Sequence, residues 1–117
     1  MSHEVALMGD MLQLVAEDMR QRGLSKVKRL KLRVGTLSHS APDALEMAFE
    51  IHKALKSPIL TDESTLEIEV EEARARCVLC GHEYTPDQRV ALCPNCGVPG
   101  GELIAGDEIR ILSYEGD

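Results

Sequence analysis

Four cysteines are the residues of this sequence most able to do chemistry. They are the only cysteines in the chain, and they form two Cys-x2-Cys pairs separated by twelve residues: Cys77, Cys80, Cys93 and Cys96. A tight turn within each pair would direct two sulfurs to one point, and two facing pairs would make the tetrahedron of thiolates that suits Zn²⁺. A glycine follows each pair and Pro94 lies inside the second, as such turns require. The spacing predicts a zinc ribbon.

Two disulfides, or four unrelated thiols, are the alternatives to a zinc site. Nothing at the N-terminus resembles a secretory signal, so we do not expect an oxidising compartment. Four protein thiolates leave zinc no open position for water or substrate, so this Zn²⁺ would be structural. Elsewhere we find no nucleophile with a base at recognisable spacing and no phosphate-binding loop with a lysine. We therefore do not expect an enzyme.

Composition limits the partners that the chain could bind. Its 117 residues carry a formal net charge of -7, from 20 acidic and 13 basic side chains. Tyr84 is the only Phe, Trp or Tyr near the cysteines, and the arginines there are outnumbered by carboxylates, which disfavours nucleic-acid binding. No apolar run approaches the length of a membrane span. We expect a cytoplasmic protein that binds neither nucleic acid nor membrane.

Two helices are predicted outside the cysteine region. Apolar residues spaced by three and four predict an amphipathic helix over 5–22, and we interpret its stripe of methionines as core filling. A second helix is predicted over 41–56, with Ser40 as its N-cap and Pro42 in its first turn. His52 falls on the apolar face of this helix, so we interpret it as a residue at the edge of the core.

Three strands are predicted by alternating polar and apolar residues. The strand over 27–34 has a basic outer face and the strand over 65–71 an acidic one, with Leu66, Ile68 and Val70 turned inward. Opposite charges favour placing these two strands side by side, each pair adding a few tenths of a kcal/mol, roughly. The alternative is that both faces are merely solvated. Residues 108–112 predict a last strand.

The order of these elements predicts an α+β fold in which a three-stranded sheet with two helices carries an inserted four-cysteine zinc ribbon. We expect residues 1–73 and 107–117 to form one domain and residues 74–106 to form the ribbon domain. The insertion would be joined to the sheet near residues 73–76 and again near residues 105–106.

The N-terminus, Met1-Ser2-His3-Glu4, is a second candidate metal site. If Met1 is retained, the amine, two amide nitrogens and the His3 imidazole form a square-planar nitrogen set, which Ni²⁺ and Cu²⁺ favour. If Met1 is removed, the Ser2 amine, the His3 amide and its imidazole supply three donors, with the Glu4 amide as a candidate fourth. A histidine near a terminus often binds no metal. His39, His52 and His82 remain candidates for extra ligands.

Several short motifs, in order along the chain, resemble the HypA/HybF family: HEVAL at 3–7, GTLS at 35–38 followed by Pro42, AFE at 48–50, the four-cysteine ribbon and GDEI at 106–109. The resemblance implies a nickel metallochaperone of [NiFe]-hydrogenase maturation, built as a nickel-binding domain with an inserted zinc ribbon. It implies transient Ni²⁺ cargo bound by His3, with Glu4 beside it. It also implies delivery, with a HypB-type GTPase, to the hydrogenase large-subunit precursor. A homodimer is left open.

Two positions depart from that family pattern. Family members usually begin Met-His-Glu, whereas Ser2 is inserted here; removal of Met1 would restore the amine-X-His arrangement. The turn at 35–38 often carries glutamate where Thr36 stands, so no role is assigned to Thr36. The alternative function, from another class, is a zinc-ribbon adaptor that binds protein and carries no nickel. A small metalloenzyme, the third candidate, would need an open metal site.

Overall fold

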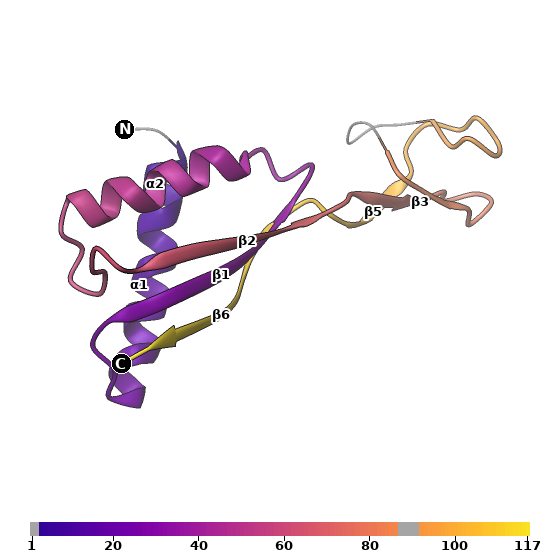
Figure 1. The fold of residues 1–117 in the computed structure, drawn as a ribbon. Helices are drawn as coiled ribbons and strands as arrows, with labels where there is room; N and C mark the ends of the chain where they lie inside the picture. The colour runs from indigo at the N-terminus through magenta and orange to yellow at the C-terminus, as the bar shows by residue number, and fades with distance from the viewer. Residues whose placement is uncertain (1–2, 87–91) are drawn as a thin grey trace.

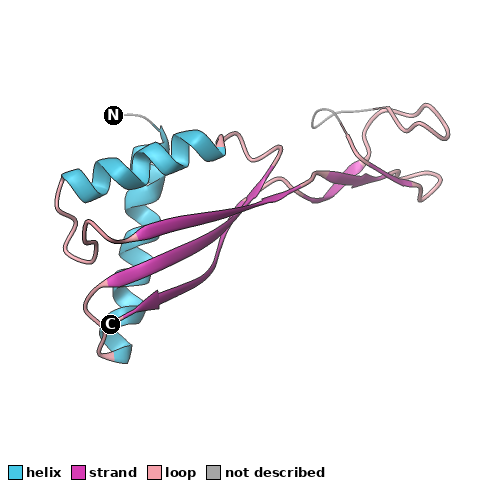
Figure 2. Cartoon of the chain, in the orientation of Figure 1, coloured by secondary structure: helices cyan, strands magenta, loops and turns pink. Residues whose placement is uncertain are grey.

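The computed structural model describes residues 3–86 and 92–117, which fold into two helices and two small sheets. The helices and one sheet lie at one end of an elongated molecule, and the second sheet lies at the other (Figure 1; Figure 2). The long axis of the molecule is 53 Å. The elements are α1 (His3–Arg22), β1 (Val27–Gly35), α2 (Pro42–Ala54), β2 (Thr65–Glu71), β3 (Arg74–Arg76), β4 (Glu83–Tyr84), β5 (Glu102–Ala105) and β6 (Ile109–Gly116).

The first sheet has the strand order β2-β1-β6, and the predicted α+β class is confirmed. β1 and β2 run parallel and are connected through α2, whereas β6 runs antiparallel to β1. Both helices pack on one face of this sheet and share a single apolar core with it. No helix among the described residues is both long enough and apolar enough to cross a membrane.

The core contains the predicted methionine stripe. Met8, Met11 and Met19 are all buried in α1, where they pack with the inward residues of β1 and with α2. Phe49 is the largest fully buried side chain among the described residues.

Val70 was predicted to face inward, and this prediction was wrong, because Val70 is 57% exposed. Val70 lies near the end of β2, where the strand extends towards the second sheet and lines an open hollow beside the loop that precedes α2.

Opposite charges on the outer faces of β1 and β2 do meet, as predicted. Arg33 Nε lies 2.9 Å from Glu69 Oε2, and Arg29 Nε lies 3.9 Å from Glu67 Oε2. Arg29 also contacts Glu115 of β6, at 2.6 Å. Pairs this exposed contribute little free energy each, so their main effect is to fix which strands are neighbours.

Several element boundaries differ from the prediction: α1 begins at His3 instead of residue 5, and α2 spans Pro42–Ala54 instead of 41–56. The N-cap of α2 is Ala41, without a side-chain hydrogen bond, because the chain turns Ser40 into the interior. Within the described residues the Ser40 Oγ has no hydrogen-bond partner. Pro42 begins the helix and removes one of the N–H groups that a cap would satisfy. β6 continues to Gly116, beyond the predicted end at residue 112, because its C-terminal half pairs with the start of β1.

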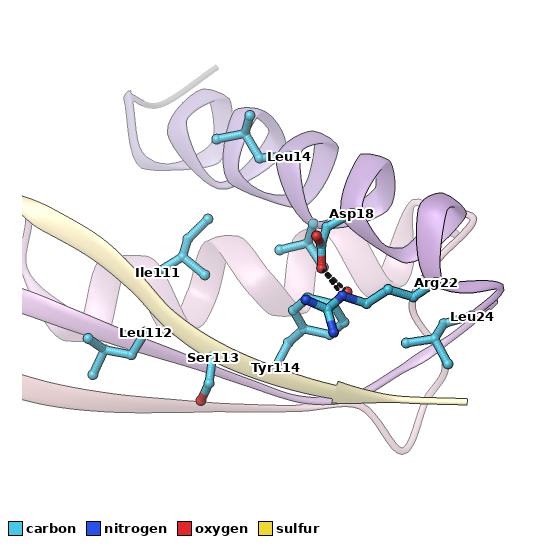
Figure 3. Close-up of a pocket in the computed structure, with 9 residues that line it drawn as sticks. Leu14, Asp18, Arg22, Leu24, Ile111, Leu112, Ser113 and Tyr114 are labelled. Atoms are coloured by element: carbon cyan, nitrogen blue, oxygen red, sulfur yellow. Dashed lines mark hydrogen bonds and ion pairs between the residues drawn. The ribbon is translucent and has the colours of Figure 1, made fainter.

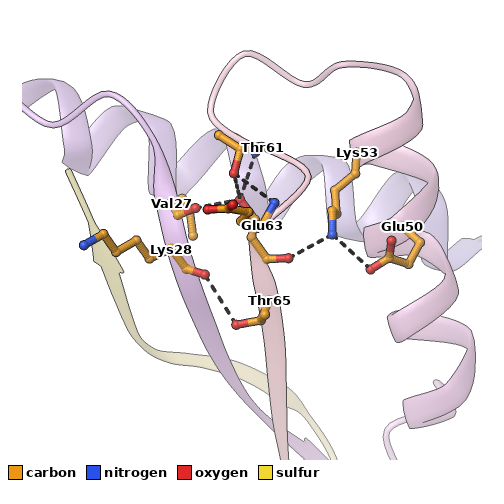
Figure 4. A network of polar contacts seen from close by, with 8 residues as sticks. Val27, Lys28, Glu50, Lys53, Thr61, Glu63 and Thr65 are labelled. Carbon is orange, nitrogen blue, oxygen red and sulfur yellow. Dashed lines mark hydrogen bonds and ion pairs between the residues drawn. The ribbon is translucent and has the colours of Figure 1, made fainter.

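The loop between α2 and β2 is fastened by a buried serine. Ser64 Oγ donates to the Val27 carbonyl at 2.6 Å and accepts from the Thr61 N–H at 2.9 Å. Lys53 Nζ donates to the Ser64 carbonyl at 3.0 Å and also contacts Glu50 (Figure 4). These contacts hold the end of α2 against the start of the sheet.

A shallow groove lies between α1 and β6. Apolar side chains line it, together with a polar cluster in which the Tyr114 hydroxyl donates to Asp18 (Figure 3). Asp18 also pairs with Arg22 at 2.8 Å. The Tyr114 hydrogen bond first, and then the charge of Arg22, lower the pKa of Asp18 below its usual value. The cluster ties the second half of α1 to the edge strand.

Two glycines meet where the chain crosses between the sheets. A Cβ on Gly35 would lie 2.2 Å from the Gly106 carbonyl carbon, and one on Gly106 would lie 2.4 Å from Ala73 Cα. Gly106 also has a φ of 82°, a conformation that glycine adopts at no steric cost. Around this crossing, Ala73 N–H donates to Thr36 Oγ1 and Gly106 N–H donates to Glu71 Oε1, both at 3.0 Å. Backbone contact and hydrogen bonds therefore join the two sheets closely.

Candidate metal centres

Each cysteine pair sits on a turn closed by backbone hydrogen bonds. Gly81 N–H donates to the Cys77 carbonyl at 3.0 Å, and Gly97 N–H donates to the Cys93 carbonyl at 2.8 Å. Both glycines have a φ of 74°, in the left-handed region that other residues rarely adopt. The glycine that follows each pair in the sequence therefore does what the spacing predicted: it lets the chain turn back on itself directly after the second thiol.

The second sheet, of order β4-β3-β5, supports these two turns. Among the described residues its small core contains Ala75, Cys77, Tyr84 and Cys93, with Leu103 packed against them. Tyr84 also stacks with His82, the ring planes being 10° apart and the centroids 6.5 Å apart. One thiol of each pair, Cys77 and Cys93, is thus buried, while Cys80 and Cys96 remain exposed.

The four sulfurs converge on one point. All four Sγ atoms lie within 4.8 Å of one another, with Cys77 and Cys96 at 3.4 Å and Cys80 and Cys93 at 3.7 Å. Tetrahedral zinc with Zn–S bonds of about 2.3 Å places its sulfurs about 3.8 Å apart. The four-cysteine site therefore fits a zinc ion, and none of its thiols is in a disulfide. In the part of the chain that the structure describes, no other group of three or more His, Cys, Asp or Glu side chains converges in this way.

The thiols differ in acidity because their neighbours differ. The Asn95 amide donates to Cys80 Sγ at 3.5 Å and is the main cause that lowers the pKa of Cys80 to about 6. The Val98 N–H lowers the pKa of Cys96, but the hydrogen bond to Cys77, with burial and the other sulfurs, outweighs it and raises this pKa to about 12. Four adjacent sulfurs resist becoming thiolates together unless a cation neutralises them. Sequence reasoning missed Asn95, although its place inside the second cysteine pair was the available signal.

The predicted nickel site lies at the opposite end of the chain and is only partly described. Met1 and Ser2, which carry the candidate terminal amine, lie outside the described residues. His3 is the first residue of α1 and is exposed, and Glu4 follows half-buried. The N–H groups of the first four residues of a helix have no acceptor within that helix. A metal could therefore take the amide nitrogens of His3 and Glu4 without breaking a helical hydrogen bond.

The other histidines lie in three separate places. His52, in the last turn of α2, is half-buried, and its Nε2 is 2.8 Å from the Val5 carbonyl oxygen, which confirms its place at the core edge. His39 is exposed in the loop before α2, with a φ of 68°. His82 lies on the ribbon, next to Tyr84. The structure does not gather these side chains into a second metal cluster within the described ranges 3–86 and 92–117.

The fold and site together define a class of protein: a small α+β unit joined to a four-cysteine ribbon that fits structural zinc. Comparison with known proteins identifies the family within this class. Residues 1–116 match the model of the family described as HypA, hydrogenase/urease nickel incorporation, metallochaperone. The chain belongs to this HypA family of nickel metallochaperones.

Relatives and solved structures agree with this assignment. The chain is 37% identical to the hydrogenase maturation factor HypA of Rhizobium leguminosarum, over 97% of each chain. It is 38% identical to that of Moorella thermoacetica, over 98% of this chain and 99% of the relative. The solution structure of the Ni metallochaperone HypA from Helicobacter pylori shares the fold, with a TM-score of 0.69 at 22% identity, over 98% of this chain and 97% of the other.

Proposed function

We propose that the protein binds Ni²⁺ at its N-terminus and, with a HypB-type GTPase, delivers it to the [NiFe]-hydrogenase large-subunit precursor. The match of residues 1–116 to the nickel-incorporation family carries the proposal. The exposed position of His3 at the start of α1, where a partner can reach it, supports it further. The exchange would take place in the cytoplasm, and a homodimer is compatible with the same chemistry.

Nickel cargo and zinc would occupy different residues. Zn²⁺ is assigned to Cys77, Cys80, Cys93 and Cys96, where it would stabilise residues 74–106 as a module distinct from residues 1–73 and 107–117. With those thiolates committed to zinc, the best nickel donors left are the N-terminal amine, backbone amides and the His3 imidazole, with Glu4 adjacent. Strong in-plane nitrogen donors pair the d8 electrons, so the bound nickel should be square planar and diamagnetic.

Metal counting on the purified full chain tests this proposal. His3→Ala should abolish specific nickel uptake and leave the zinc content unchanged, and acetylation of the N-terminal amine should have nearly the same effect. His39→Ala is the matched control, because it removes an exposed imidazole in the loop before α2, away from the N-terminus in the sequence. If His3→Ala protein takes up one nickel per chain at unchanged affinity, the site lies elsewhere and the assignment is wrong.

The same titration has a defined pH dependence. Nickel must displace protons from the imidazole, the α-amine and the amides. Affinity should therefore rise with pH across the range in which histidine and the α-amine titrate, from about 6.5 to about 8. Zinc content should stay constant over this range. An affinity that is flat with pH would count against amine and imidazole donors.

A second candidate function is a zinc-ribbon adaptor that binds protein and carries no nickel. Three large apolar side chains on or beside the two cysteine turns favour it, since Val78, Leu79 and Leu92 are 63%, 73% and 65% exposed. Exposed apolar residues that are neighbours in the chain, as Val78 and Leu79 are, can contribute to a protein-binding surface. Wild-type protein that binds zinc but takes up no nickel would favour the adaptor over the metallochaperone.

A further inference from the structure

His52 makes a hydrogen bond from α2 to the first turn of α1. Its Nε2 lies 2.8 Å from the backbone carbonyl oxygen of Val5. A carbonyl oxygen can only accept, so Nε2 carries the hydrogen and donates it. Within α1 the same oxygen faces the N–H of the residue four positions on, and a carbonyl oxygen has two lone pairs, so it can accept from the imidazole as well. The contact therefore adds to the helical hydrogen bond instead of replacing it.

Gly9 provides the space for this contact. A Cβ at position 9 would lie 3.2 Å from His52 Cε1, which is closer than most Cβ contacts, and 3.5 Å from Nε2, which is an ordinary contact distance. The φ of Gly9 is not in the left-handed region, so the backbone itself does not require glycine there. Glycine is among the least favourable residues inside a helix. Its presence at this position is explained by the approach of the imidazole.

The contact is placed where it can affect the candidate nickel donors. Val5 lies two residues after His3 and one after Glu4, in the same helical turn. First turns of helices fray, because their N–H groups lack partners. A hydrogen bond from a neighbouring helix restrains this turn and so limits the directions in which the His3 amide and imidazole can point.

We infer that His52 is a positioning residue for nickel binding: it holds the first turn of α1 in the conformation from which His3 coordinates the metal. The inference rests on the proposed function, since it assumes that His3 is a nickel ligand. We assign His52 no place among the metal ligands: its Nε2 hydrogen is committed to the Val5 carbonyl, and its role is to hold the helix turn.

The test compares two substitutions of His52 in the zinc-loaded full chain. His52→Leu keeps the bulk and removes the donor, whereas the side-chain amide of His52→Gln can donate from nearly the position of Nε2. We expect His52→Leu to weaken nickel binding by about two- to tenfold, the range that one hydrogen bond contributes, and to alter the visible absorption of bound nickel. His52→Gln should restore both properties. His82→Leu, on the ribbon, is the control for the loss of an imidazole.

Gly9→Ala gives an independent second variant. Alanine favours the helix, yet its Cβ would push the imidazole away from Val5, so nickel affinity should fall even as the helix gains stability. A readout without nickel completes the test: in metal-free protein, His52→Leu should speed hydrogen exchange at the amides of residues 7–9, which bond back to the first turn.

Four results would overturn the inference. The first is nickel affinity and exchange at residues 7–9 unchanged in His52→Leu while His3→Ala abolishes uptake. The second is an equal loss of nickel affinity in His52→Leu and His52→Gln that follows the fall in their melting temperatures. That result would make His52 only a structural residue. The third is Gly9→Ala binding nickel as well as wild type. The fourth is nickel uptake retained by His3→Ala, which would refute the proposed function itself and remove the basis for a positioning role.

Discussion

Substitution of one buried zinc-ligand candidate, Cys93→Ser, should unfold the ribbon and spare the remainder of the chain. Cys93 is 2% exposed and belongs to a core that has four buried members among the described residues, in which Tyr84 and the partly buried Leu103 are the large side chains. Burial of two such side chains contributes about 3–6 kcal/mol in total. Structural zinc contributes about 10–16 kcal/mol in small modules. Bound zinc would therefore stabilise the ribbon more than its apolar core does, and the ribbon should not persist without the metal.

We expect the first sheet and its helices to remain stable without zinc. Their core holds fourteen buried residues, none of which is a cysteine. Hydrogen exchange measured by mass spectrometry, with zinc counted on the same sample, gives the comparison directly. In Cys93→Ser protein we expect zinc to be lost and the amides of residues 74–86 and 92–106 to exchange freely, while those of α1, β1 and α2 remain protected.

Asn95→Ala is the matched control for Cys93→Ser. It removes the amide that donates to Cys80 Sγ but keeps all four thiols, so zinc and ribbon protection should be retained. Two results would refute the reasoning. One is a zinc-free Cys93→Ser ribbon that stays protected, and the other is loss of protection in core and ribbon together.

The remaining predictions concern partner binding and stability. Substitution of Glu4, or of the polar face of α1, should weaken binding of the GTPase in titrations, while ribbon substitutions should spare it; the reverse pattern would move the docking site to the ribbon. Tyr114→Phe should destabilise the fold at neutral pH by removing the hydrogen bond that, with Arg22, lowers the pKa of Asp18. The difference in unfolding free energy from wild type should shrink as pH falls through that lowered pKa, below the usual 3.8, because protonated Asp18 loses this advantage. Ser64→Ala should cost about 1–3 kcal/mol in denaturant unfolding, because Ser64 is 1% exposed and its hydroxyl would no longer bond the Val27 carbonyl and Thr61. Thr65→Ala, at a neighbouring exposed position, should cost less.

Periodicity and spacing predicted most of the fold because those signals are local. The apolar stripe of α1, the opposite charges of β1 and β2 and the two cysteine pairs each depend on residue types at fixed intervals, and each is present as predicted. The family was predicted from the resemblance of several short motifs. The structure locates the two predicted nickel residues: His3 is exposed and Glu4 is half-buried. Their roles as ligands stay predictions.

The features that the sequence did not predict depend on tertiary packing. Ser40 has the residue type of an N-cap, but packing draws it inward and Pro42 starts the helix without it. Val70 fits the alternation of a half-buried strand, but the helices do not cover that end of β2. The contact between His52 and Val5 joins residues 47 positions apart, so no local pattern could have predicted it. Thr36, which was given no role, accepts a hydrogen bond at the crossing between the sheets.

The close backbone contact between Gly35 and Gly106 limits where residues can be inserted into this chain or deleted from it. Backbone touches backbone there, and the two connections to the ribbon are anchored by Thr36 and Glu71. One residue inserted after Gly106 would shift β6 along β1 and turn every inward side chain of that strand outward. An insertion before Ala73 would move Ala73 away from Thr36 and Gly106, which it contacts at the crossing. Natural relatives and engineered grafts should therefore differ freely in the residues of the ribbon. The number of residues in its two connections, at Ala73 and at Gly106, should stay fixed.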